Sequence, residues 1–441
     1  MTPASIATSD DVLTLMQRHR SDTSADVVPI RADANTADFW HRRPVLTHVL
    51  EFARARRAGP WAVLAVTLAR TVASVEPNVM LPPIVGGPVS LNMFAALVGP
   101  SGGGKGAAEG AARDAVRFVD HNDIDVDAET FTLGSGEGLA RTFMPGGPDD
   151  DEGRRTRALF TVQEVDTLAA LGGRTGSTLL PELRKLYSGE TIGFQNANRN
   201  TRVVVPAHEY RACLTVGVQP AKAATLIHDA DGGTPQRFVW LPVDDPDAPD
   251  VKPDDPRVWT VKAPRWGSDR VFLEVPDMAR QTIDEHRLAV LRGEPVDPLD
   301  GHRMLSRLKI AAALALLSGQ SVIGDEDWFL SGVVMAKSDR TRGRIETALS
   351  EQTRRTNRAR AELDGERAMI VDEVKSAGEM QRAVDGIVRH LSRKGRMSAS
   401  DLRRTLRVNL REHFADAIAA LVESGEVLEF NDAGREYFEL A

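Results

Sequence analysis

Apolar residues form short continuous runs that alternate with helical repeats over the central part of the chain. The runs at 91–98, 159–162 and 213–218 are bounded by glycine or polar residues, which is typical of strands buried on both faces of a sheet. Segment 105–118 is rich in alanine and spaces its larger apolar residues as a helix does. The alternation predicts an α/β core built around a buried sheet.

Further changes in pattern divide the chain into segments. Glycine and proline separate two helical patterns near 40–57 and 61–74, and an acidic, proline-rich stretch begins at Asp244. We expect a flexible N-terminal arm (1–35), an N-terminal helical region (36–75), the α/β core (76–242), a linker and connecting segment (243–300), a helical subdomain (301–375) and a C-terminal domain (376–441).

The C-terminal segment reads as three helices followed by two strands. The patterns are helices at 382–394, 400–407 and 411–424 and strands at 426–430 and 436–440. This order predicts a winged helix. Residues 376–414 carry nine basic and four acidic side chains, a net of +5, so Arg403, Arg404 and Arg407 are candidate DNA contacts. A winged helix that contacts only protein is the alternative.

Composition narrows the class of protein. The chain has 441 residues, enough for about two to four domains at roughly 150 residues each. Its net charge of −8 argues against a uniformly basic nucleic-acid coat but allows a local basic patch. A single cysteine, Cys213, allows no disulfide within the chain, so we expect a reducing compartment, the cytoplasm. We expect no signal peptide and no membrane span, because no apolar run reaches ~18 residues.

A glycine-rich motif, GPSGGGKG, lies between the predicted strand at 91–98 and the predicted helix at 105–118. It matches the phosphate-binding P-loop pattern at both glycines and at the lysine. Glycines let consecutive backbone N–H groups curl around phosphate oxygens, and the next helix offers its positive N-terminus. We therefore expect a P-loop NTPase core, RecA-like or AAA+-like, that binds ATP. The expected nucleotide-binding residues are Gly99, Ser101, Gly102, Gly103, Gly104, Lys105, Gly106 and Ala107.

Two positions depart from the usual metal-binding pattern. The Ser or Thr that normally follows the lysine and holds Mg²⁺ is Gly106, and the acidic residue expected after the second strand is Gln163. We expect Mg²⁺ to be held through water, by Ser101 or by Asp166. Slow hydrolysis, or nucleotide binding without hydrolysis, stays open.

Two carboxylates compete for the role of orienting the attacking water. Glu164 follows the predicted strand at 159–162, and phosphoryl transfer needs positioning and electrostatics more than covalent help. Glu137 lies on a neighbouring strand–loop–helix junction, where recombinase-like ATPases carry their catalytic Glu. A plain helix N-cap by Ser135 explains that junction equally well.

Two other side chains suit roles around the terminal phosphate. Gln219 ends the strand at 213–218, where ATPases place a sensor of the γ-phosphate. Arg237 lies on a turn before another strand and is a candidate arginine finger for a neighbouring subunit, with a structural ion pair as the alternative.

Residues 191–206 contain two strand patterns around a basic, amide-rich tip. They predict a hairpin just before the sensor strand, the position from which hexameric replicative helicases aim a hairpin into their central channel. Its tip would make sequence-independent, salt-sensitive contacts with single-stranded DNA. A solvated surface hairpin is the alternative. The candidate contacts are Asn198, Arg199 and Arg202, with Arg184 and Lys185 on the preceding helix as secondary contacts.

As a set, these motifs resemble a known family. The segments PPIVGGPVSLNMFAALVGPSGGGKG, GSGEGLA, GSTLLPELRKLYSGETIGFQ, YRACLTVGVQP and GTPQRFVWLP, followed by an apolar helix and DEDWFLSGVVMAKSD, are similar to P-loop ATPase modules of actinobacterial phages, prophages and plasmids. The resemblance covers residues 40–339. Such modules often accompany or are fused to primase-polymerase domains, and they are usually described as replicative helicases.

The resemblance implies an ATP-dependent, ring-forming replicative helicase or helicase-like initiator of a phage or mobile element. It implies single-stranded or forked DNA as the substrate, a homo-oligomer that is a hexamer, and a primase-polymerase partner. The alternative is a nucleotide-gated DNA-binding or regulatory assembly factor that never separates strands. Stimulation of ATP hydrolysis by single-stranded DNA distinguishes the two.

Overall fold

The chain folds into two compact units. The computed structural model describes residues 36–145, 154–174, 176–195, 202–229, 232–295, 301–432 and 434–441. The first unit extends to Leu349 and the second from Ser350 to Ala441. In the part of the chain that the structure describes, no helix has both the length and the apolar run that a bilayer crossing needs.

A parallel sheet of five strands forms the centre of the first unit. The strand order is β10-β3-β9-β6-β5, and every neighbouring pair is parallel. The strands are β3 (Phe94–Val98), β5 (Thr130–Thr132), β6 (Arg157–Val162), β9 (Arg211–Val218) and β10 (Phe238–Pro242). This confirms the α/β core that the sequence predicts, and all five carboxyl ends meet at one edge of the sheet.

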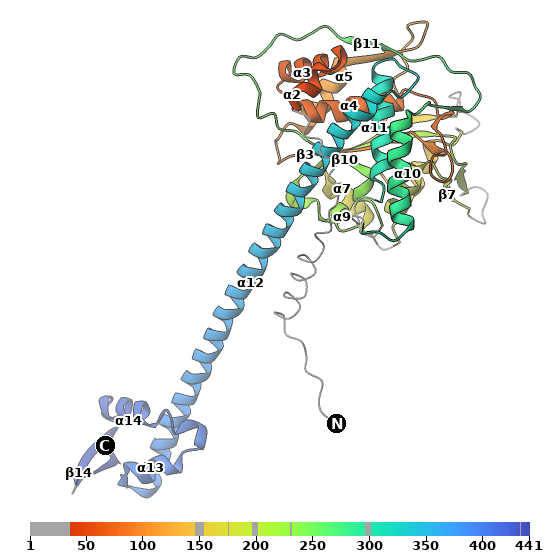
Figure 1. Cartoon of the computed structure of the whole chain (residues 1–441). Helices are drawn as coiled ribbons and strands as arrows, with labels where there is room; N and C mark the ends of the chain where they lie inside the picture. Colours follow the sequence, from red (N-terminus) through yellow and green to blue (C-terminus); the bar gives the residue numbers. More distant parts are fainter. Residues whose placement is uncertain are drawn as a thin grey trace. The chain divides into compact units, whose positions relative to one another are not determined.

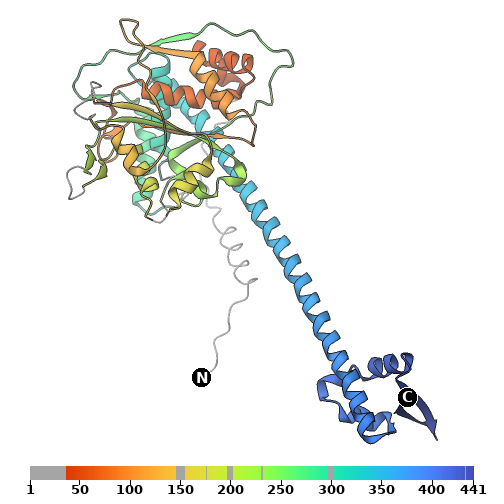
Figure 2. The ribbon, with the colours of Figure 1, turned by 180° about the vertical axis from the view of Figure 1, so that it is seen from behind.

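Helices cover both faces of this sheet (Figures 1 and 2). Side chains alternate along each strand, so Ala95 and Leu97 pack into one core and Phe94 and Ala96 into the other. The first core contains α2 (Thr36–His41), α3 (Pro44–Ala55), α4 (Pro60–Ala73), α5 (Lys105–Ala115), α10 (Asp277–Leu291) and α11 (Arg303–Leu317). The second contains α6 (Gly136–Arg141), α7 (Val165–Gly172), α8 (Leu179–Ser188) and α9 (Ala224–Ile227).

Helix α4 lies in the middle of the first core. All of its residues are buried, and it packs against α5, α11 and the sheet. A helix that is apolar all round has to be enclosed by other elements. For this reason the segments 36–75 and 301–349 are parts of one core with the sheet, whereas the sequence predicts separate helical regions there.

Shorter strands surround the central sheet. They are β1 (Val79–Leu81), β2 (Val89–Ser90) and β12 (Val271–Phe272) in a three-stranded sheet, β4 (Val116–Val119) paired with β11 (Trp259–Lys262), and the hairpin of β7 (Ile192–Phe194) and β8 (Val203–Val205). The helix predicted at 105–118 ends earlier, at Ala115. Its predicted last turn is β4 instead, because Val116 and Phe118 are buried in register with β11.

Two buried cations, Arg211 and Lys309, donate hydrogen bonds to backbone carbonyls in the first unit. Arg211, the first residue of β9, donates to three backbone carbonyls of the segment that follows α4. Lys309 on α11 donates to the carbonyl oxygens of Asn92 (2.8 Å) and Tyr187 (2.6 Å). Burial lowers the pKa of both side chains, that of Arg211 to about 10. The bonds of Arg211 fix the start of β9, whose other end enters the candidate site, and those of Lys309 join α11 to α8 and to the segment before β3.

Helix α12 (Asp325–Lys394) begins in the first unit and ends in the second. The domain boundary that the sequence predicts near residue 376 therefore lies inside one continuous helix. Residues 350–378 of this helix are all exposed. Gly365 and Gly378 do not interrupt it, although the sequence predicts separate helices here.

The second unit packs the end of α12 against two short helices and a small sheet. The remaining elements are β13 (Met397–Ser398), α13 (Ala399–Thr405), a 3₁₀ turn at Val408–Leu410, α14 (Phe414–Glu423), β14 (Val427–Asp432) and β15 (Arg435–Leu440). The sheet is antiparallel with the order β13-β15-β14. Its core contains Ile387, Leu391, Leu402, Leu421 and Phe438. The predicted helices and strands of this segment are present, with ends that differ by a few residues.

Candidate nucleotide site

The candidate site lies where the strands of the central sheet end. In an open parallel sheet, ligands bind outside the carboxyl ends at the point where the strand order reverses. After β3 the chain goes to β5 at the far edge of the sheet and returns through β6 to β9. It then passes over β3 to form β10 on the other side of β3, so the strand order reverses next to β3. The loop that follows β3 therefore occupies this point.

Glycines shape the loop between β3 and α5. Gly102 (φ 72°) and Gly104 (φ 91°) adopt left-handed conformations, which favour glycine. A Cβ on Gly99 would lie 2.1 Å from Cγ2 of Val243, so that position has no room for a side chain. A Cβ on Gly102, Gly104 or Gly106 would meet no atom within 4 Å. The loop is thus packed against the sheet on one side and has open space on the other.

Lys105 is the first residue of α5 and lies over the loop. Its Nζ donates to the carbonyl oxygens of Gly99 (3.2 Å) and Pro100 (2.8 Å). Partial burial lowers the pKa of Lys105, and the charge of Glu164 partly opposes this effect. The ammonium is held by neutral acceptors at the positive end of a helix, so an anion is a better partner than either carbonyl.

Of the two candidate bases, Glu164 lies nearer to the loop by topology. It follows β6, which is two strands from β3, whereas Glu137 lies in the first turn of α6 after the edge strand β5, three strands away. Each strand adds about 4.8 Å. The charge of Glu164 acts on the pKa of both Lys105 and Lys222. The Ser135 hydroxyl accepts from the N–H of Gly138 (3.1 Å), so the N-cap predicted at the rival junction is present.

The end of β9 joins the loop to the end of β6. The N–H of Gly99 donates to the carbonyl of Val218 (2.9 Å), which places Gln219 directly beside the loop. A Cβ on Gly217 would lie 2.1 Å from the carbonyl oxygen of Gln163 and 3.3 Å from Cδ of Lys105. The structure therefore brings Lys105, the Gln163–Glu164 pair and Gln219 to one edge of the sheet.

Asp166, a predicted metal ligand, has a cationic partner. It lies in the first turn of α7 and forms an ion pair and hydrogen bond with Lys222, in the 3₁₀ turn Pro220–Lys222 after Gln219. Both side chains are 45% exposed. Sequence reasoning missed Lys222. Its only signal was a basic residue three positions after the sensor candidate.

A buried carboxylate, Glu109, explains why Gln163 replaces an acidic residue. Glu109 lies one turn after Lys105 on α5 and accepts from Nε2 of Gln163 (2.8 Å) and from the hydroxyl of Thr161 (3.1 Å). An aspartate at position 163 would face Glu109 with a like charge. Sequence reasoning missed this network, although an acidic residue on the buried alanine face of α5 was a visible signal.

Among the described residues, few of the oxygens that the sequence assigns to Mg²⁺ are available. Gly106 and Ala107 offer no side-chain oxygen, and Asp166 is paired with Lys222. The amide nitrogen of Gln163 is bound to Glu109, which leaves its Oε1 as the ligand atom. The exposed hydroxyl of Ser101 is the other candidate. Mg²⁺ keeps several waters and binds phosphate oxygens, so two neutral protein oxygens fit a weakly held ion.

The Arg237 side chain makes its contacts within the first unit. Its Nη1 donates to the carbonyls of Gly232 (3.1 Å) and Gly233 (2.7 Å), and its guanidinium lies over the ring of Tyr187. Burial lowers its pKa. An arginine finger would have to leave these bonds to reach another subunit. The described contacts are with carbonyl oxygens and a ring rather than with a carboxylate, so both the finger and the structural ion pair stay predictions.

The predicted DNA contacts of the first unit fall into three groups. The hairpin is confirmed, because β7 and β8 pair antiparallel, but Asn198 and Arg199 lie outside the described residues. Arg202, just before β8, is exposed. Arg184 pairs with Asp229 (3.1 Å) and Lys185 with Glu182 (2.7 Å), so these two secondary contacts already have acidic partners.

In the second unit, the predicted DNA-contacting arginines and several exposed acidic side chains lie on different elements, although α13 also exposes Asp401 and β15 also exposes Arg435. Arg403 and Arg404 on α13 and Arg407 just after it are exposed. Helix α14 instead exposes Ala415, Asp416, Ala419, Ala420 and Glu423. The β14–β15 hairpin exposes Glu429, Asp432 and Glu436. The predicted cationic surface is present on α13 and does not extend to α14.

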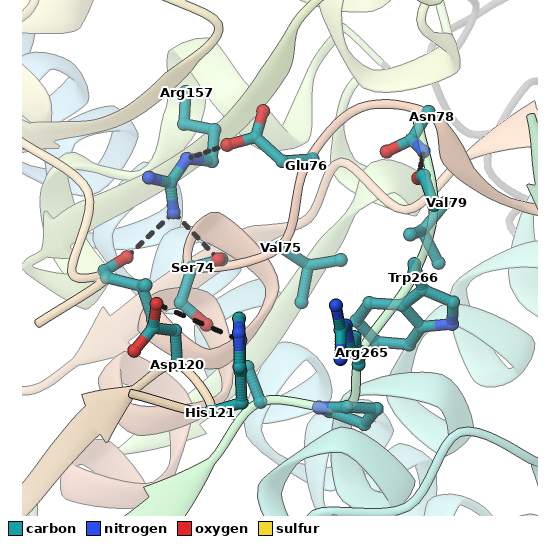
Figure 3. A pocket seen from close by; sticks show the side chains of 14 residues that line it. Ser74, Val75, Glu76, Asn78, Val79, Asp120, His121, Arg157, Arg265 and Trp266 are labelled. Carbon is teal, nitrogen blue, oxygen red and sulfur yellow. Dashed lines mark hydrogen bonds and ion pairs between the residues drawn. The ribbon is translucent and has the colours of Figure 1, made fainter. Parts of the chain in front are cut away.

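A separate cavity of about 390 Å³ lies at the opposite edge of the sheet (Figure 3). Arg157, which starts β6, lines it and donates to the carbonyls of Ser74 and Val126 (both 2.7 Å) and to Glu76 (2.9 Å). Trp266 and His121 close other sides. Since Arg157 begins the strand that Glu164 follows, this cavity is distinct from the candidate site.

The chain matches no protein-family model and no curated protein.

Proposed function

We propose that the first unit is a P-loop ATPase, RecA-like or AAA+-like, that binds ATP at the loop after β3. The observation that carries this proposal is the position of Lys105 over a glycine loop at the point where the strand order reverses. The glycine conformations and the open space beside the loop support it. Backbone N–H groups and the ammonium would then replace the hydration of the phosphate chain.

The neighbouring strand ends supply the groups that hydrolysis needs. Glu164 is the proposed base that orients the attacking water, and Gln219 is the proposed sensor of the γ-phosphate. A Mg²⁺ ion, when bound, neutralises phosphate charge. Gln163 and Ser101 are the proposed protein ligands for it. The weak metal site supports slow hydrolysis.

DNA remodelling is the proposed use of this ATPase. The β7–β8 hairpin precedes β9, so it is connected through one strand to Gln219 and Lys222. This connection supports a ring-forming helicase or helicase-like initiator in which nucleotide state moves a DNA-binding hairpin. We further propose that the second unit is a winged helix in which α13 contacts phosphates. The absence of Arg, Asn and Gln on the exposed face of α14 argues against bidentate readout of guanine or adenine there.

The test is the rate of ATP hydrolysis with and without single-stranded DNA. We expect stimulation for the wild-type chain and weaker stimulation for Arg202→Ala, since that change removes a phosphate contact of the hairpin and leaves the loop intact. The exposed Arg292→Ala at the end of α10, outside the proposed DNA contacts, is the matched loss of charge and should leave stimulation unchanged. A rate of ATP hydrolysis that is the same with and without single-stranded DNA would contradict the helicase proposal.

One observation favours a second candidate function. Position 106 lacks a hydroxyl, and the amide that replaces the usual acid at 163 is bound to Glu109. A site built in this way suits a nucleotide-gated assembly factor, in which ATP orders the subunits and strands are never separated. Assembly with a non-hydrolysable ATP analogue, without DNA-stimulated turnover, would support this function.

A further inference from the structure

The ion pair between Lys222 and Asp166 connects the two loops that frame the candidate site. Asp166 lies two residues after Glu164, at the end of β6. Lys222 lies three residues after Gln219, at the end of β9. Since β6 and β9 are adjacent, the pair closes the gap between the proposed base and the proposed sensor.

Lys222 and Lys105 approach the same carboxylate from different elements. The pKa of Lys222 is raised, mainly by its hydrogen bond to Asp166 and by the charge of that group, and also by Glu164. Glu164 acts on Lys105 in the same direction. Lys222 follows the end of β9, which is bonded to the loop at Gly99, and it is paired with Asp166 two residues from Glu164, so it lies on the side of the site that faces a terminal phosphate bound by Lys105.

We propose that Lys222 is a second phosphate-binding cation of this site, which exchanges Asp166 for the terminal phosphate when a nucleoside triphosphate binds. The inference rests on the proposed ATP-binding function and adds the residue that distinguishes triphosphate from diphosphate. Asp166 then acts as the counter-ion that holds Lys222 in place before binding, and not as a metal ligand.

The exchange is physically reasonable because the present pair is exposed. Solvent-exposed ion pairs contribute little to stability, so breaking this one costs little. A terminal phosphate carries more charge than a carboxylate and offers three acceptor oxygens. Diphosphate lacks that group, and Lys222 then stays with Asp166.

The two partners of the ion pair give a decisive test. If the pair is only structural, Lys222→Met and Asp166→Asn remove the same interaction and change nucleotide affinity in the same direction. If Lys222 binds phosphate, the two changes act in opposite directions. The first removes the ligand of the phosphate, and the second removes its competitor.

The experiment measures the Kd of the full chain for a non-hydrolysable ATP analogue and for ADP by calorimetry. For Lys222→Met we expect analogue affinity to fall roughly tenfold, as for the loss of one charge-assisted hydrogen bond, with ADP affinity unchanged. For Asp166→Asn we expect analogue affinity to rise a few-fold. Lys222→Arg keeps the charge and should keep the preference for triphosphate, and the double variant should behave as Lys222→Met.

Each other outcome has a distinct meaning. Equal shifts in the same direction for both single variants, or equal loss of ADP and analogue in Lys222→Met, would overturn the role of Lys222 and leave the ATP site standing. A wild-type chain that binds neither nucleotide would overturn the proposed function and this inference together.

Discussion

The carboxyl edge of the central sheet and the second unit differ in whether the arrangement of their strands and helices brings the candidate functional side chains together. At the sheet edge, a cation, a carboxylate and an amide from three strand ends converge beside a glycine loop. In the second unit the helices and strands follow the predicted order, but α14 exposes alanine and acidic residues, and the arginines predicted to contact DNA lie on α13 and just after it. Convergence of unlike groups is a stronger indication of function than an arrangement of elements.

The largest expected effect comes from the sheet edge. Lys105→Ala removes the ammonium over the loop, and charge-assisted contacts of this kind contribute about 3 kcal/mol or more to phosphate binding, over 100-fold in Kd. We expect nucleotide binding to be lost in calorimetry while the melting temperature changes little, because the described hydrogen bonds of the Lys105 side chain are with two carbonyls of the loop.

Lys185→Ala is the matched control, a partly exposed lysine of the same unit that pairs with Glu182. Undiminished ATP affinity in Lys105→Ala would show that the loop after β3 is not a phosphate site.

The sheet edge shows what could be predicted from sequence and what could not. The glycine loop, Glu164 and Gln219 follow apolar runs directly, so local pattern places them at strand ends. Glu109 and Lys222 act through partners 54 and 56 residues away along the chain, which no local pattern records. The burial of α4 within the sheet's core was also missed, because its apolar character is equally compatible with a separate helical domain.

The second prediction distinguishes the two carboxylates at this edge. Glu164→Gln should keep ATP affinity and lower kcat by roughly 10²–10⁴-fold, the usual contribution of a positioned general base. Glu137→Gln removes an exposed carboxylate of α6, one strand farther from the loop, and should lower kcat less than twofold. A larger loss from Glu137→Gln would reverse the assignment and favour the recombinase-like arrangement.

The third prediction tests the second unit. Replacing Arg403, Arg404 and Arg407 with alanine should weaken duplex binding equally across sequences and lower the salt slope by about 2–3, at roughly 0.9 per phosphate contact. The reason is that α13 supplies charge while α14 exposes no Arg, Lys, Asn or Gln for bidentate contacts with guanine or adenine. Gel-shift titrations at several salt concentrations give both quantities.

The control for this triple variant removes the same charge from another exposed part of the unit, with Arg354, Arg355 and Arg358 of α12 changed to alanine. If both triple variants lower affinity equally, the arginines of α13 have no special position. If the α13 variant leaves DNA affinity at the wild-type value, the unit is a protein-binding module.

The smallest expected effect concerns the missing hydroxyl at position 106. Gly106→Thr adds the oxygen that normally holds Mg²⁺ after the lysine, and the structure leaves open space for a Cβ there. Thr is also tolerated better than Gly in the first turn of a helix. We expect the Mg²⁺ concentration for half-maximal hydrolysis to fall a few-fold.

Gly106→Val has the same shape without the hydroxyl, so it isolates the effect of the oxygen and should leave the metal requirement unchanged. Equal behaviour of the two variants would mean that Gln163, Ser101 and water already complete the metal shell, and that the departure at position 106 has no cost for catalysis.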